Sequence, residues 1–270
     1  MTPDSPAPSN PSVMLSSAHR THIGQTRKVN QDSLLVMEVD RVNLSRPNPL
    51  GVYAVADGLG GQQAGEVASG LVVSTIANCA QTELFKWFLD GSLVETDVLD
   101  WLRKTIAITN QMVQDRRGEA GNNMDSTLVM IVVEGQRVHV AHVGDSRVYL
   151  LPNAGSLERV TYDHSLVEQL VLARQITPAQ ARKHPQKNVI YRTMGQKDVE
   201  PEIRPFQLEP GDRLVLCCDG LHGMIEDEQI EAITREAASP AEAVRKLVDA
   251  ANEAGGSDNI SVIVVEIVTA

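Results

Sequence analysis

The sequence is poor in cysteine, in basic residues and in long apolar runs, and each shortage excludes a class of protein. Only three cysteines occur in 270 residues, and Cys217 and Cys218 are neighbours inside an apolar run. An odd number with this spacing favours neither a disulfide framework nor a zinc site, so we expect reduced core cysteines. The 24 basic residues are outnumbered by 35 acidic ones, and the formal net charge is −11. This balance argues against a broad basic face for nucleic acid or for an anionic membrane.

Long apolar segments are also missing. No run approaches the roughly 18 to 20 residues that a membrane-spanning helix requires, and no charged start followed by an apolar block marks a signal peptide. We therefore expect a soluble, cytoplasmic protein. Residues 1–17 are rich in Pro and Ser, which is typical of a disordered leader, and residues 18–270 then form one domain.

What the sequence does contain is many short runs rich in Val, Ile and Leu, bounded by turn-forming residues. These strand-like runs begin at Ser33, Val52, Ser126, Arg137, Arg147, Asp212 and Asn259. Very short turns join the three runs within 126–151, which predicts antiparallel neighbours. Helical spacing of apolar residues occupies separate segments, 64–88, 97–117 and 240–253, whereas 44–49 and 183–188 are typical of loops. This segregation predicts an α+β layered domain.

Four aspartates stand at the ends of these runs, each beside glycine or another small residue. Asp57 and Asp219 each follow an apolar run and precede glycine, Asp145 lies between two runs, and Asp258 comes just before the last run. Converging carboxylates raise one another's pKa, and a bound divalent cation removes that cost. Oxygen ligands without a Cys/His set favour magnesium or manganese over zinc.

Ordinary structural explanations remain open for each of these residues. An Asp-Gly pair after a strand is more often a turn, and Asp258 could form an Asx turn before the final strand. Spacing alone does not show that the four side chains converge. Arg27 precedes the first strand-like run and suits a phosphate clamp, because guanidinium offers two parallel donors, but a surface arginine fits equally well.

Taken together, these segments resemble the metal-dependent protein serine/threonine phosphatases of the type 2C family, in their compact bacterial form. The matching segments, in the family's order, are "RKVNQDS", "VADGLGGQQAGEVAS", "MDSTLVMIVV", "VGDSRVYLL", "VTYDHSLVEQLV", "VIYRTMG", "LVLCCDGL" and "GGSDNISVIVV". They cover the chain from about His22 to Val268. The resemblance implies a four-layer αββα sandwich, with two antiparallel β-sheets flanked by helices. It also implies a flap at about residues 161–195 that borders the active site.

The resemblance assigns metal ligands. Asp57 would bridge two manganese or magnesium ions, and Gly58 would offer its carbonyl oxygen to one of them. Asp219 and Asp258 would ligate the other ion. Asp145, together with Asp219, would form a weaker third site.

It also assigns residues around the ligands. Arg27 would hold the substrate phosphate, and Asp32 would support the ligands. Two positions depart from the family's pattern: Gln31 stands where many relatives have glutamate, and Leu59 stands where eukaryotic relatives carry a histidine proposed as general acid. The proton donor to the leaving group is therefore open.

The function that the resemblance implies is hydrolysis of phosphoserine and phosphothreonine in proteins, by a water shared between the two ions. The expected partners are phosphorylated proteins made by a serine/threonine kinase, and we expect a monomer that binds neither nucleic acid nor membrane. Two alternatives stay open: a phosphatase for small phosphoesters, and a catalytically silent phosphoprotein-binding module. Retention of all four aspartates disfavours the silent module.

Overall fold

Two antiparallel β-sheets form the centre of the protein, whose computed structural model describes residues 12–43, 46–61 and 64–270. The first sheet has the strand order β1 (Val13–His22), β11 (Ile260–Thr269), β10 (Arg213–Cys217), β7 (Arg147–Leu151) and β8 (Glu158–Arg159). The second has the order β2 (Asp32–Asn43), β3 (Arg46–Leu59), β5 (Leu128–Glu134), β6 (Arg137–Val143) and β9 (Glu202–Gln207). The short β4 (Asp125–Ser126) pairs with the end of β3.

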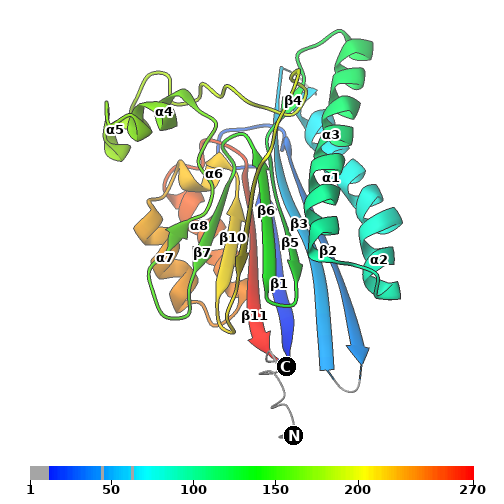
Figure 1. The fold of residues 1–270 in the computed structure, drawn as a ribbon. Coiled ribbons are helices and arrows are strands. Elements are labelled where there is room, and N and C mark those ends of the chain that lie inside the picture. The colour runs from blue at the N-terminus through cyan, green and yellow to red at the C-terminus, as the bar shows by residue number, and fades with distance from the viewer. Residues whose placement is uncertain (1–11, 44–45, 62–63) are drawn as a thin grey trace, which may run out of the picture.

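Helices cover the outer face of each sheet (Figure 1). On the second sheet lie α1 (Ala64–Cys79), the π-helical turn η1 (Ala80–Leu84), α2 (Phe85–Asp90) and α3 (Glu95–Ala120). On the first lie α6 (Asp219–His222), α7 (Asp227–Glu236) and α8 (Pro240–Glu253). Two further helices, α4 (Leu166–Leu172) and α5 (Pro178–Arg182), stand away from these layers. The four-layer sandwich and its antiparallel sheets are confirmed.

Among the described residues, no helix has the length and apolar character needed to cross a membrane.

Strand β3 shows why the layers form. Its side chains alternate between the two faces of the sheet. Val52, Ala54 and Ala56 pack toward the helices, while Tyr53 and Val55 pack between the two sheets, and all five are fully buried. A strand that is buried on both faces must be apolar at every position. The first ionisable residue after this run, at position 57, is therefore delivered at the end of the core.

The expected leader is too long. Val13–Ser17 belong to β1, which pairs with β11 along its whole length, from Val13 opposite Thr269 to His22 opposite Ile260. Only Val13 of this edge strand is fully buried and most of its other residues are half-buried, so it forms without a strong apolar pattern. The backbone pairing with β11 supplies the order that composition does not reveal. The rest of the expected leader, residues 1–11, lies outside the described residues.

The expected loop at 44–49 is also wrong in part. Arg46–Pro49 continue β3 and pair with β2, with Pro49 opposite Asp40. The ladder between β3 and β5 begins only at Leu50. Pro47 and Pro49 precede it, so the N–H that each proline lacks costs no hydrogen bond of that ladder. Residues 44–45 lie outside the described part of the chain. The loop expected at 183–188 is confirmed.

Candidate metal centre

Five aspartates gather where strands of both sheets end. Asp32 opens β2 and lies directly opposite Asp57 of β3 in the strand register. The others come from the turn between β6 and β7, from the start of α6 after β10, and from the residue pair before β11: Asp145, Asp219 and Asp258. The charges of the other four all act to raise the pKa of Asp57, so the side chains do converge.

The backbone around Asp57 is held on both sides. The Thr127 N–H donates to the Asp57 carbonyl oxygen over 2.8 Å, and the Asp57 N–H donates to Thr127 Oγ1 over 3.0 Å. The next residue, Gly58, donates its N–H to the carbonyl oxygen of Gln31 over 3.1 Å. The end of β3 is thus fixed between the starts of β2 and β5.

Glycine is required where β3 meets helix α1. A Cβ on Gly58 would lie 2.0 Å from the carbonyl oxygen of Gly65, and a Cβ on Gly65 would lie 2.6 Å from that of Gly58. No side chain fits into this contact, so the start of α1 packs directly on the strand end.

Burial and mutual repulsion hold four of these carboxyl groups toward their protonated forms. The pKa of Asp57 is raised well above its usual range, first by burial and then by the charges of Asp32 and Asp219. Burial raises the pKa of Asp32 to about 7, although Ser261 Oγ donates a hydrogen bond of 2.7 Å to its carboxylate. Burial and the charge of Asp258 raise the pKa of Asp219 to about 6. Burial and then Asp219 raise that of Asp145.

Three carboxylate oxygens in this cluster are buried without a hydrogen-bond partner among the described residues: Asp32 Oδ1, Asp145 Oδ1 and Asp219 Oδ1. Buried acceptors are normally satisfied, so orphaned oxygens among crowded like charges call for a cation. Every donor is a hard oxygen, which suits magnesium or manganese. The residues present therefore fit a divalent metal site.

Arg27 lies at the rim of the cluster. Its Nη2 is 2.6 Å from Asp258 Oδ2, and half of its side chain is exposed. The hydrogen bond to Asp258 raises the pKa of Arg27, and the charges of Asp219 and Asp57 add to this effect. The guanidinium thus combines proximity to the carboxylates with access to solvent.

The comparisons with known proteins agree with this geometry. Residues 20–260 match the family model "Protein phosphatase 2C". The chain belongs to the protein phosphatase 2C family. The protein phosphatase PhpP of Streptococcus pneumoniae is 36% identical over 249 residues, which cover 91% of this chain and 94% of that protein.

Solved structures show the same protein phosphatase 2C fold. The Mycobacterium tuberculosis serine/threonine phosphatase PstP/Ppp is 32% identical, with a TM-score of 0.79 over 94% of this chain and 98% of that one. The catalytic domain of PstP, described in complex with two manganese ions, is 31% identical, with a TM-score of 0.79 over 95% and 99% of the two chains.

The residues that fix this phosphatase centre from behind were not found by sequence reasoning. Asn259 Oδ1 accepts the Gln31 N–H over 2.8 Å, and Ser69 Oγ donates to the Gln31 carbonyl oxygen over 2.6 Å. Gln31 therefore acts in the fold through its main chain, as a junction between β2, α1 and β11. Ser261 and Thr127 were missed as well. Each acts on a residue far away in the chain, so no local pattern marks it.

A separate group of possible metal ligands lies beyond Gly144. His142, His164 and Glu202 bring ligand atoms within 4.8 Å of one another. The two imidazole rings are stacked at 4.6 Å and only 8° apart, so one ion could not lie in both ring planes. His164 Nδ1 also accepts the Gly144 N–H, and Arg192 Nη1 lies 3.1 Å from His164 Nε2. This group is better suited to packing than to metal binding.

Proposed function

We propose that this chain is a metal-dependent phosphatase that hydrolyses phosphoserine and phosphothreonine in proteins. The observation that carries the proposal is the convergence of desolvated aspartates with orphaned oxygens beside Arg27. The relatives support it, because they are named as protein phosphatases and one is described with two manganese ions.

The proposed ligands are Asp57, which would bridge two ions, the Gly58 carbonyl oxygen, Asp219 and Asp258. Asp145 and Asp219 would hold a weaker third ion. When bound, such cations lower the pKa of water and neutralise charge on phosphoryl oxygens. Folding already brings these carboxylates together against their mutual repulsion, so the binding of a cation relieves that repulsion.

The chain's own residues would orient the phosphate. Arg27 can present further N–H donors to a phosphate while its pairing with Asp258 keeps it beside the cluster. Asp32 would stay in place through its hydrogen bond from Ser261, and Gln31 through its main-chain contacts. Leu59 offers no proton, so protonation of the leaving alkoxide must come from water or another side chain.

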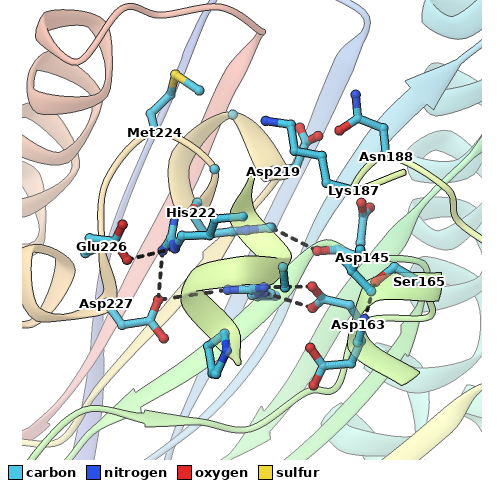
Figure 2. Close-up of a pocket in the computed structure, with 18 of the residues that line it drawn as sticks. Asp145, Asp163, Ser165, Lys187, Asn188, Asp219, His222, Met224, Glu226 and Asp227 are labelled. Atoms are coloured by element: carbon cyan, nitrogen blue, oxygen red, sulfur yellow. Dashed lines mark hydrogen bonds and ion pairs between the residues drawn. The ribbon is translucent and has the colours of Figure 1, made fainter. Parts of the chain in front are cut away.

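A cleft beside the centre favours protein substrates over small phosphoesters. It has a volume of about 460 Å³ and runs between the flap and the α6–α7 region. Figure 2 shows Asp145 and Asp219 near Lys187 and Asn188 of the flap, with Glu226 further along the cleft. A sugar phosphate would leave this surface unused, whereas residues that flank a phosphoserine could occupy it.

The setting of the reaction is part of the proposal. Phosphoproteins made by a serine/threonine kinase are expected where ATP is present, which supports a cytoplasmic enzyme. The three cysteines are unpaired and buried, as suits a reducing compartment. We propose that the enzyme acts as a monomer, because the expected centre draws all of its ligands from one chain.

The test compares a phosphothreonine peptide with a sugar phosphate, each with manganese and with a chelator. We expect a higher kcat/KM for the peptide, and reversible loss of activity on chelation. Full activity in chelator would contradict the metal dependence. A preference for the sugar phosphate would favour the small-phosphoester alternative, and no hydrolysis of either substrate would favour the silent binding module.

A further inference from the structure

The flap, residues 161–195, is anchored to the body at its base. Met194 pairs with Ser126 beside β3, and an isolated antiparallel bridge between Ser165 and Ile190 joins the two arms of the flap to each other. Beyond this base, α4 and α5 extend from the sandwich near α6 (Figure 1). The cleft of about 460 Å³ separates α5 from the α6–α7 region, whereas α4 is held at its start by the ion pair of the buried Glu168 with Arg159.

One side chain spans this gap. Arg182, the last residue of α5, donates from Nη1 to the His222 carbonyl oxygen over 2.7 Å and from Nη2 to that of Ile225 over 3.2 Å. Its Nε lies 2.7 Å from Glu226 Oε2. Among the described residues, the hydrogen bonds and ion pairs between 169–188 and the body outside the flap all come from Arg182.

These contacts reach the end of the helix that begins at the metal centre. Helix α6 starts at Asp219 and ends at His222, whose carbonyl oxygen accepts from Arg182. The His222 ring nitrogen Nε2 also lies 3.0 Å from the Asp145 carbonyl oxygen. Arg182 therefore ties the flap to the helix that begins at Asp219 and contacts the main chain of Asp145.

We propose that Arg182 is a latch that holds the flap over the cleft and thereby positions the flap for phosphoprotein substrates. The proposal rests on the proposed function for its substrate and adds the residue that controls flap position. A small phosphoester reaches only the metal centre and does not use the flap. A phosphopeptide must also occupy the cleft, so its binding depends on where the flap stands.

The guanidinium is suited to this role and an ammonium is not. Its planar fork reaches two carbonyl oxygens and one carboxylate at once, from three different nitrogens. Lysine keeps the charge but offers a single nitrogen. The side chain of Arg182 is 27% exposed, so its bonds are partly shielded from water.

The test uses the full chain loaded with manganese, as wild type and as Arg182→Ala, Arg182→Lys and Lys183→Ala. Lys183 is the matched control, because it is the adjacent residue, it is exposed, and its loss removes the same charge. Hydrogen exchange of amides in 166–189 reports flap opening without any activity. Turnover of p-nitrophenyl phosphate and of a phosphothreonine peptide reports the effect on substrates.

We expect Arg182→Ala to speed exchange in the flap by about tenfold or more, as for loss of a charge-assisted hydrogen bond. Its KM for the peptide should rise several-fold, while kcat for p-nitrophenyl phosphate stays within about twofold, because only the peptide uses the flap. Arg182→Lys should recover only part of the effect, and Lys183→Ala should match wild type.

Three results would overturn the latch. Unchanged flap exchange in Arg182→Ala would show that other contacts hold the flap. Faster exchange with an unchanged KM for the peptide would show that the latch does not position substrate. Equal losses with both substrates would indicate damage to the metal centre. If wild type does not hydrolyse the peptide, the proposed function fails, while the exchange data still decide whether Arg182 is the latch.

Discussion

Arg27 is proposed to bind the substrate phosphate, and a single substitution tests this role. Replacing it with alanine removes donors proposed to bind phosphate in both ground and transition states. We therefore expect a higher KM for phosphopeptides, by about 10-fold to 100-fold, which corresponds to the roughly 1.5 to 3 kcal/mol of a charge-assisted hydrogen bond. Steady-state kinetics with manganese present would measure it.

Arg20→Ala is the matched control for Arg27→Ala. Arg20 also pairs with an aspartate, Asp249, at 2.9 Å, but this pair lies on β1 and α8. The control should leave KM unchanged, as surface ion pairs contribute little. If Arg27→Ala kept a wild-type KM, Arg27 would be an ordinary surface arginine.

At the level of single residues, the sequence predicts the candidate metal ligands better than the residues that hold them in place. Asp57 and Asp219 could be singled out because each follows an apolar run and precedes glycine. Their convergence could not be derived from spacing, and it came from the family resemblance. Asn259 and Ser261 contact residues more than 200 positions away in the chain, so only the folded structure brings them to Gln31 and Asp32.

Among the contacts between elements, the one between β3 and α1 leaves no room for a side chain. Gly65 and Gly70 lie in the same helix, but only Gly65 faces another backbone. Gly70→Ala should stabilise the protein by about 0.5 to 1 kcal/mol, because alanine favours the helix and nothing lies within 4 Å of the new Cβ. Gly65→Ala also raises helix propensity, but its new Cβ would lie 2.6 Å from the Gly58 carbonyl oxygen and from Gln31 Nε2, so these groups must move away.

We expect Gly65→Ala to lower the free energy of unfolding by about 1 to 3 kcal/mol, as overpacking does, and to weaken manganese binding. Denaturant unfolding of both variants without metal, followed by metal titration, would measure these effects. Equal stabilisation by the two substitutions would show that the β3–α1 contact is looser than described.

Helices and strands with a clear apolar pattern were predicted more accurately than those with a weak one. The helix at 240–253 is reproduced at both ends, because Ser239 caps it and Pro240 opens it. The segment 64–88 is helical, but it contains a π-helical turn at Ala80–Leu84 that spacing does not reveal. Strands β1 and β9 were missed, because both are edge strands with weak alternation.

At the level of the whole molecule, the proposed metal ligands come from both sheets. Asp219 and Asp258 adjoin strands of the first sheet, Asp32 and Asp57 belong to the second, and Asp145 joins β6 of one to β7 of the other. A cation bound here would connect both sheets. Metal binding should therefore stabilise the whole fold, and not only one loop.

This stabilisation should depend on pH. The folded metal-free protein holds the Asp32 pKa at about 7 and the Asp219 pKa at about 6, above the roughly 3.9 of an unfolded aspartate. Stability from such raised pKa values is present at low pH and is lost as pH rises through the folded pKa. The same protons compete with metal. The gain in melting temperature on adding manganese should therefore increase from pH 5 to pH 7.5.

Buried histidines also change stability with pH, because burial lowers the pKa of His164 to about 4 and that of His222 to about 3. They stay neutral in the folded state, with or without metal, so the manganese-induced shift isolates the aspartates. A shift that is constant, or that falls over this pH range, would contradict the assignment of these carboxylates to the metal centre.

If Asp57 joins two cations, removing its charge must weaken the binding of both, and calorimetric titration of manganese into metal-stripped protein measures this binding. We compare wild type with Asp57→Asn, which is nearly isosteric but carries no charge, and with Asp249→Asn as a surface control. Wild type and control should bind about two ions per chain tightly, whereas Asp57→Asn should lose most of this affinity. Manganese binding by Asp57→Asn with wild-type stoichiometry and affinity would contradict the account.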